Sequence, residues 1–161
     1  MNKTIFLLMA FTLNSLTGFA QKVPKGRLVY CSYCADGHAG LGKNYLELIA
    51  DDLNKARISA HYDVDCRFAE ETTKETPVDS ATVAELQELL KQLKVWKLDG
   101  YHKEEFIDGG ITHRFHVEYS DGRKVTASWY CHRPKQAAIQ AFNTIRSFLD
   151  KHIQTAKIRN D

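Results

Sequence analysis

The chain has 161 residues, of which 43% are hydrophobic, and its 22 Lys and Arg nearly balance its 20 Asp and Glu. This length and this hydrophobic content suit one domain with its own core. The near-neutral charge argues against a protein that holds nucleic acid electrostatically, because such proteins need a basic surface to displace phosphate counterions.

The first twenty residues have the pattern of a secretory signal peptide. Lys3 gives a basic start, an apolar run covers residues 5–11, and Gly18-Phe19-Ala20 is a small-x-small cleavage site. The run is shorter than the ~20 apolar residues of a membrane-spanning helix. We therefore expect cleavage after Ala20 and a secreted or periplasmic single domain, residues 21–161, without a membrane span. The alternative is a retained N-terminal anchor.

Strand signals dominate the beginning of the expected mature chain. Residues 27–34 are rich in β-branched and aromatic side chains and predict a strand, and the glycine-rich residues 36–42 predict a turn after it. Apolar and polar residues alternate from Ile58 to Phe68, which predicts a strand with one buried face. Residues 45–50 fit a helix or a strand, and we favour a strand that pairs with 58–68 as a hairpin.

A leucine-rich helix is expected after a polar loop at residues 70–76. Asp79 or Ser80 can cap its start, and Asp99-Gly100 breaks it after it ends near Trp96. Its apolar stripe consists of Val83, Leu86, Leu89, Leu90 and Leu93.

A β-hairpin is expected over residues 111–131. A two-residue turn at 121–122 would place Val117 opposite a polar residue, so that each face of the hairpin would carry both apolar and polar residues. A three-residue loop at 120–122, with Gly122 at positive φ, instead places Val117 opposite Val125. We prefer this second register, since it gives the hairpin one apolar face that helices can cover.

A last helix is expected after the loop that follows the hairpin. Pro134 suits its first turn. Its buried side would comprise Ala138, Phe142, Ile145, Leu149 and Ile153. The order of strands, helix, strands and helix predicts an α+β fold, an antiparallel sheet with two principal helices packed on one face.

The expected mature chain has four cysteines: Cys31, Cys34, Cys66 and Cys131. An even number in an exported protein favours disulfides. In an extended strand the Cα atoms of Cys31 and Cys34 would lie about 10 Å apart at roughly 3.3 Å per residue, beyond the roughly 7 Å that a disulfide can bridge. We expect each to pair with Cys66 or Cys131, although Cys31 and Cys34 would point to opposite faces. Each bridge would stabilise the fold by about 2–4 kcal/mol.

Two reactive interpretations use the same cysteines. Cys31, Cys34 and His38 could be three zinc ligands, but the second ligand pair of a closed zinc site is missing. C-x-x-C is also the motif of thioredoxin-like oxidoreductases, in which it begins a helix. Here a glycine-rich turn follows Cys34, and this context argues against that chemistry.

From Trp96 onward, the chain contains an ordered set of turn and core motifs. They are Trp96-Lys97-Leu98-Asp99-Gly100-Tyr101, Ile107-Asp108-Gly109, the strand 113–119, Asp121-Gly122 and the helix after Pro134. This order resembles small uncharacterised bacterial exported domains, in which a W-x-G-[FY]-like segment precedes a D-G turn, a hairpin and a helix that begins with proline. Trp96 lies further from Gly100 than in that pattern. The resemblance implies no catalytic residues, since those domains have no assigned activity.

The sequence shows no convergent acid, base and nucleophile, which favours a non-enzyme and no cofactor. We expect an exported, disulfide-stabilised binding or interaction module for an envelope or extracellular protein or a small ligand. The alternatives are a protease inhibitor, a zinc protein and a thiol–disulfide oxidoreductase. Three aromatic residues could line a ligand groove, although isolated aromatic residues at the junction of a helix and a sheet more often belong to the core. They are Trp96, Tyr101 and Trp129.

Overall fold

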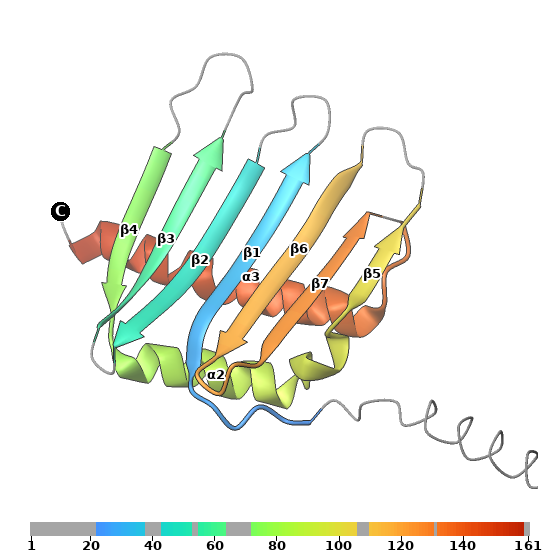
Figure 1. Ribbon diagram of the computed structural model, residues 1–161. Coiled ribbons are helices and arrows are strands. Elements are labelled where there is room, and N and C mark those ends of the chain that lie inside the picture. Colours follow the sequence, from blue (N-terminus) through green and yellow to red (C-terminus); the bar gives the residue numbers. More distant parts are fainter. Residues whose placement is uncertain are drawn as a thin grey trace, which may run out of the picture.

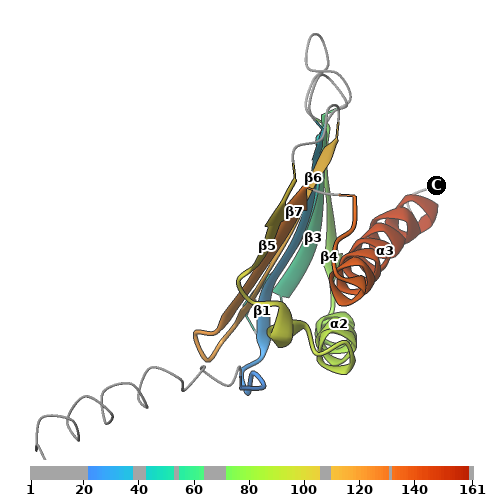
Figure 2. The ribbon, with the colours of Figure 1, turned by 90° about the vertical axis from the view of Figure 1, so that its right-hand side faces the viewer.

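The computed structural model describes residues 22–37, 43–52, 55–63, 72–105, 110–130 and 132–159. These residues form a seven-stranded sheet with two α-helices on one of its faces (Figures 1 and 2). The α+β class is therefore confirmed. The expected signal peptide lies outside the described residues, and none of the helices within them has the length and apolar character needed to cross a membrane.

The sheet is built from two groups of strands. β1 (Leu28–Gly37), β2 (Lys43–Asp52), β3 (Lys55–Asp63) and β4 (Thr72–Val78) form an antiparallel meander. β6 (Ile111–Tyr119) pairs with the other side of β1, and β7 (Lys124–Tyr130) pairs with β6. The short β5 (Tyr101–Glu104) pairs in parallel with β7, so that the order is β4-β3-β2-β1-β6-β7-β5.

Both predicted hairpins are confirmed. Residues 45–50 lie in β2, which pairs with β3 so that Leu46 is opposite Ala60, while residues 64–68 of the predicted strand lie outside the described residues. Val117 is opposite Val125, as the three-residue loop requires. Gly122 in this loop has a φ of +80°, a conformation that glycine adopts without the steric penalty of a Cβ atom.

β4 and β5 were not expected from the sequence pattern. β4 occupies much of the segment that was expected to be a polar loop, and it is an edge strand that pairs with β3 on one side. An edge position tolerates Pro77, which has no N–H to donate, and polar residues such as Lys74. β5 has four residues and is held by its pairing with β7. Backbone pairing, and not a hydrophobic pattern, defines these two strands.

α2 (Ser80–Gln92) begins at the expected cap. The Asp79 carboxylate accepts hydrogen bonds from the Thr82 backbone N–H and hydroxyl, both at 2.8 Å. The α-helix ends earlier than expected, at Gln92, because Lys94 adopts a left-handed φ of +54°. A 3₁₀ helix, η1 (Val95–Leu98), then continues the chain towards β5.

α3 (Gln136–Arg159) crosses the sheet on the same side as α2 (Figures 1 and 2). It begins two residues after Pro134, so the proline precedes the helix and does not lie in its first turn. All five of its predicted core positions are buried, and the Phe142 ring packs edge-on against Tyr33 of β1 with centroids 4.4 Å apart. The hydrophobic core therefore lies between the two helices and one face of the sheet.

His113 of β6 lies in this core layer beside aromatic rings. Its ring stacks on Trp129 with centroids 5.3 Å apart and meets Phe142 edge-on at 4.7 Å. Burial and then the nearby Arg146 charge lower the pKa of His113. Its buried Nδ1 atom has no hydrogen-bond partner in the part of the chain that the structure describes.

We expect His113→Phe to make the protein less sensitive to acid. Because the folded-state pKa of His113 is lowered, the stability linked to it is present above the unfolded pKa and is lost as the pH falls through the folded pKa. Urea unfolding at several pH values from about 7 to about 5 measures this loss. The free energy of unfolding should fall less in His113→Phe than in the wild type or in the exposed control His102→Phe, and equal slopes would contradict this role.

Candidate binding face

The strand alternation leaves one face of the sheet without a helix in the described part of the chain (Figure 2). We call this side the open face. Across β3, β2, β1, β6 and β7, its central residues are Arg57, Ser59, His61, Tyr45, Glu47, Ile49, Tyr30, Ser32, Cys34, Arg114, His116, Glu118, Lys124, Thr126 and Ser128. The strand register decides which of these side chains are neighbours.

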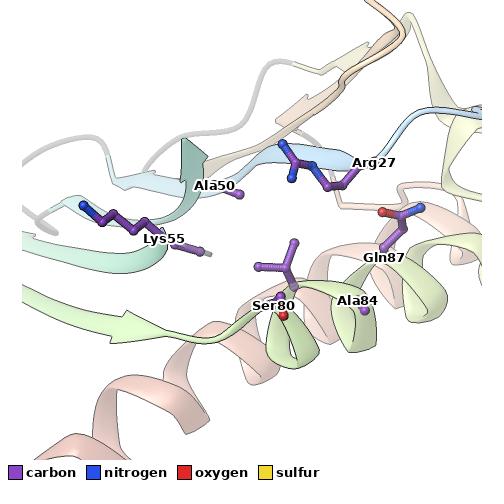
Figure 3. Close-up of a pocket in the computed structure, with 8 residues that line it drawn as sticks. Arg27, Ala50, Lys55, Ser80, Ala84 and Gln87 are labelled. Carbon is purple, nitrogen blue, oxygen red and sulfur yellow. The ribbon is translucent and has the colours of Figure 1, made fainter. Parts of the chain in front are cut away.

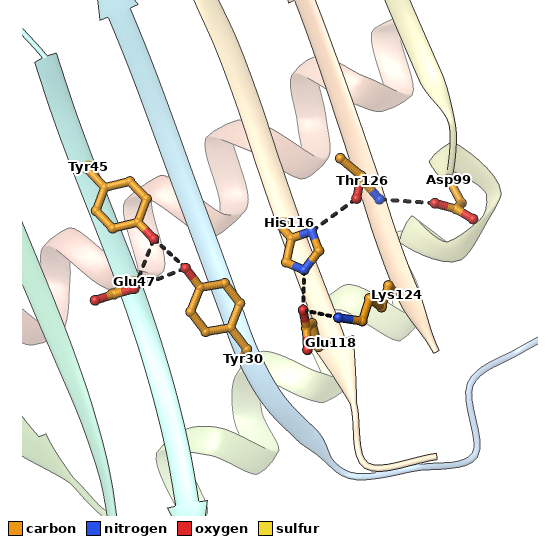
Figure 4. Close-up of polar contacts among 8 residues, drawn as sticks. All are labelled: Tyr30, Tyr45, Glu47, Asp99, His116, Glu118, Lys124 and Thr126. Atoms are coloured by element: carbon orange, nitrogen blue, oxygen red, sulfur yellow. Dashed lines mark hydrogen bonds and ion pairs between the residues drawn. The ribbon is translucent and has the colours of Figure 1, made fainter. Parts of the chain in front are cut away.

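Tyr30, Tyr45 and Glu47 converge at the middle of the open face (Figure 4). Tyr45 and Glu47 are two residues apart on β2, and Tyr30 reaches them from the neighbouring β1. Glu47 Oε2 accepts a hydrogen bond from the Tyr30 hydroxyl at 3.0 Å and from the Tyr45 hydroxyl at 2.9 Å. The two hydroxyls also lie within hydrogen-bond distance of each other, and because each has one proton, two of these three contacts are donated at any one time. We call these three residues the Tyr–Glu cluster.

The Tyr–Glu cluster is shielded from water although no described helix covers it. Only 16% of the Glu47 side chain is exposed. Burial raises the pKa of both phenols, and the contacts with Glu47 raise them further, since a carboxylate opposes the ionisation of a neighbouring phenol. The tyrosines therefore stay protonated and donate to the carboxylate.

Two imidazoles extend the cluster into a row of rings across four strands. The His61 ring on β3 lies 5.6 Å from the Tyr45 ring, and the His116 ring on β6 lies 5.7 Å from the Tyr30 ring. Ser32 and Ser59 of the same face are buried to 6% and 2% exposure. Larger neighbouring side chains therefore cover the small ones, and the open face has a shielded centre.

His116 joins the centre of the face to a second polar network (Figure 4). Its Nε2 lies 2.6 Å from Glu118 Oε1, and its Nδ1 lies 3.0 Å from Thr126 Oγ1. Lys124 Nζ donates to the same Glu118 oxygen at 2.8 Å. Hydrogen bonds from Lys124 and then His116 lower the pKa of Glu118, so this carboxylate stays ionised and is paired.

A similar contact lies at the edge of the open face. His102 Nδ1 is 2.6 Å from Ser128 Oγ, and His102 Nε2 is 3.3 Å from Glu104 Oε1. A hydroxyl, an imidazole and a carboxylate in series is the pattern of an activated nucleophile. Here 68% of the Glu104 side chain is exposed to solvent. The strand β7 also pairs with β6 on one side and β5 on the other, so the backbone N–H groups of β7 are used in the sheet and are not available for an oxyanion site. The geometry fits a cross-strand polar contact better than a catalytic triad.

Cys31 and Cys34 lie on opposite faces of β1, as the sequence predicts for an extended segment. Cys31 is fully buried opposite Val117 on the helix side, and Cys34 lies opposite Tyr45 on the open face. Burial raises the pKa of the Cys31 thiol to about 12, whereas zinc ligation and thiol exchange both require a thiolate. This placement argues against one zinc ion held by both cysteines.

The remaining residues of the cysteine hypotheses lie outside the described part of the chain. His38 and the expected disulfide partners Cys66 and Cys131 are among them. The disulfides therefore remain a prediction. Within the described residues, no group of three or more His, Cys, Asp or Glu side chains is arranged to hold a metal ion.

The three aromatic residues proposed for a groove do not lie together on the open face. Trp129 is only 4% exposed and packs in the core against His113 and Phe142. The Tyr101 hydroxyl accepts a hydrogen bond from the Lys135 backbone N–H at 2.9 Å, and Trp96 lines a small hollow beside Val23 and Pro24.

The tyrosines at the centre of the open face are Tyr30 and Tyr45, which the sequence reasoning did not single out as site residues. One signal was present in the sequence. The first three positions of β1 that face away from the helices carry tyrosine, serine and cysteine, and a charged residue comes only at the fourth, Asp36.

A separate pocket lies on the helix side, between α2 and the adjoining ends of β2 and β3 (Figure 3). It has about 390 Å³ of empty space, part of it open to solvent. Its lining consists of Arg27, Ala50, Lys55, Ala56, Ser80, Val83, Ala84 and Gln87. Gln87 is fixed in place because its Oε1 accepts a hydrogen bond from the Leu28 N–H at 2.7 Å. The described residues of the lining include no carboxylate and no imidazole, so among them there is no acid–base pair.

Comparison with known proteins assigns no family. A scan against protein-family models found no match, and a search of curated proteins found none. The resemblance to exported bacterial domains therefore stays a prediction, and function has to be argued from the site.

We expect Tyr45→Phe to weaken the fold at neutral pH and to reduce its alkaline sensitivity. Loss of a hydrogen bond to a carboxylate costs about 1.5–3 kcal/mol. Because the folded-state pKa of Tyr45 is raised, its pH-linked stability is full below the unfolded value of about 10 and is lost as the pH rises towards the folded value. Urea unfolding at several pH values above neutrality tests this, with Tyr101→Phe as control. If the free energy of unfolding of the wild type falls with rising pH no more steeply than that of Tyr45→Phe, this linkage is excluded.

We expect the reduced Cys31 thiol to resist alkylation in the folded protein, because it is buried and its pKa is raised to about 12. Iodoacetamide labelling of pre-reduced Cys34→Ser protein, followed by mass spectrometry of the Cys31 peptide, measures the rate. Labelling should be at least about 100-fold slower in buffer than in urea, as expected when opening of the fold limits access. Equal rates would show that Cys31 is accessible.

Proposed function

We propose that the chain is an exported, non-enzymatic binding module that engages its partner through the open face. The observation that carries this proposal is the Tyr–Glu cluster, a carboxylate that is 16% exposed and that accepts hydrogen bonds from two phenols. A carboxylate removed from water is costly, and an apolar residue would serve stability better. Polar groups that are kept at such a cost commonly serve recognition.

The composition of the face also supports binding. Tyrosine supplies a large contact area with little conformational freedom to lose, and it is enriched at protein interfaces. The cluster is held in place by hydrogen bonds before any partner arrives, which lowers the entropic cost of association. One or two disulfides from Cys31 or Cys34 to Cys66 or Cys131 belong to this proposal as its stabilising crosslinks.

The alternatives have less support. A zinc protein or a thiol–disulfide oxidoreductase would require Cys31 as a thiolate, and burial of this residue opposes that form. A protease inhibitor is a binding module with a particular partner, and it is compatible with the same face.

Site-specific photocrosslinking in the cells that produce the protein tests the proposal. A benzophenone amino acid replaces Arg114, which is exposed beside Cys34 on the open face, or Glu88, which is exposed on α2. We expect one discrete adduct from position 114 and none from position 88. The adduct should disappear in a Tyr30→Ser, Tyr45→Ser double variant that still unfolds cooperatively.

Two outcomes would refute the proposal. One is the absence of any adduct from position 114, and the other is the same adduct from both positions. The comparison of positions uses variants with the Tyr–Glu cluster intact, so it remains decisive even if the double variant does not fold.

A further inference from the structure

Among the described residues, Glu47 is a shielded carboxylate with no lysine or arginine in ion-pair contact. The main cations of the open face pair elsewhere: Arg57 with Asp51 at 3.0 Å, Arg114 with Asp36 at 3.8 Å and Lys124 with Glu118 at 2.8 Å. Within the described residues, the contacts of Glu47 are the two phenols and the His61 imidazole. Glu104 likewise has an imidazole partner, but its side chain is 68% exposed and is therefore solvated.

The two oxygens of Glu47 have different surroundings. Oε2 accepts both phenol hydrogen bonds, while Oε1 points away from the tyrosines (Figure 4). His61 Nε2 lies 3.8 Å from Oε1, which is beyond hydrogen-bond distance. Neutral phenols stabilise a carboxylate without neutralising it, so with respect to the described residues Oε1 keeps negative charge and spare acceptor capacity.

The rings beside Oε1 favour one kind of cation. Tyr45 and His61 lie next to each other with centroids 5.6 Å apart, and they offer aromatic surface beside the carboxylate. A guanidinium stacks on aromatic rings, donates several hydrogen bonds in one plane and is more weakly hydrated than an ammonium. A phosphate or carboxylate group would instead be repelled by Glu47.

We infer that Glu47, Tyr45 and His61 form a recognition site for the guanidinium of an arginine side chain on the partner. This inference rests on the proposed function, because it names the chemistry of the partner at the open face. The guanidinium would donate to Oε1 and lie against the rings, while the hydrogen bonds from Tyr30 and Tyr45 hold the carboxylate in position.

Nuclear magnetic resonance titration of the mature chain with N-acetylarginine amide tests the inference. We expect saturable shifts of the Tyr45 and His61 ring resonances, with a dissociation constant in the millimolar range that is usual for so small a ligand. Glu47→Gln should weaken binding at least about tenfold, which corresponds to about 1.4 kcal/mol. The glutamine amide oxygen can still accept hydrogen bonds from the phenols, so this variant keeps the cluster together. Glu104→Gln, on the same face, is the matched control and should bind like the wild type.

Three further small-molecule probes test which charge and which head group the site prefers. N-acetylcitrulline amide has a similar shape without the charge, and equal binding of citrulline and arginine would overturn the inference. Equal binding of N-acetyllysine amide would overturn the preference for a guanidinium, and tighter binding of an N-acetylglutamate probe would overturn the sign of the charge. An unchanged affinity in Glu47→Gln would exclude Glu47 as the acceptor.

The titration and the crosslinking separate the two proposals. If position 114 still gives its face-specific adduct but arginine does not saturate, the binding module stands and the guanidinium site fails. If arginine saturates at Glu47 but position 114 gives no face-specific adduct, the site exists and the proposed function fails.

Discussion

The structure depends on the packing of both α-helices against a single face of the sheet. The side chains that point to that face, such as Tyr33, Phe115 and Val117, are buried by α2 and α3 and supply the core. The opposite face gains no such cover from the described residues, so its side chains have to satisfy one another. They do so through cross-strand hydrogen bonds, ion pairs and ring contacts, and the small Ser32 and Ser59 are buried beneath larger neighbours.

Because both helices lie on one side of the sheet, its two faces contribute to the protein in different ways. The helix face holds the apolar residues whose removal from water stabilises the fold. The open face holds a carboxylate, two phenols and two imidazoles in fixed positions, an arrangement that adds specificity more readily than stability. Glu118 is neutralised by Lys124 and His116, whereas the partners of Glu47 within the described residues are two neutral phenols and a more distant imidazole. The charge left at Glu47 is what distinguishes the centre of this face from an ordinary solvated strand surface.

Elements with a strong hydrophobic period could be predicted from the sequence. The register of the β6–β7 hairpin followed from keeping Val117 and Val125 on one side, and the buried stripe of α3 followed from its helical spacing. β4 and β5 could not be predicted, because edge strands are held by backbone pairing and need no apolar pattern. The Tyr–Glu cluster was also out of reach, since Tyr30 and Glu47 become neighbours only through the β1–β2 register. The opposite orientations of Cys31 and Cys34 followed from the strand period alone.

The central claim, that the face opposite the helices is open in the whole chain, is tested most directly by solvent relaxation enhancement with a neutral gadolinium chelate. Alternate residues of β7 provide an internal comparison, since Thr126 points to the open face while Val125 and Ala127 point to the helices. We expect the methyl group of Thr126 to relax strongly and those of Val125 and Ala127 to be protected. Equal protection of all three methyl groups would mean that another part of the chain or a second copy covers the open face, and would contradict the account.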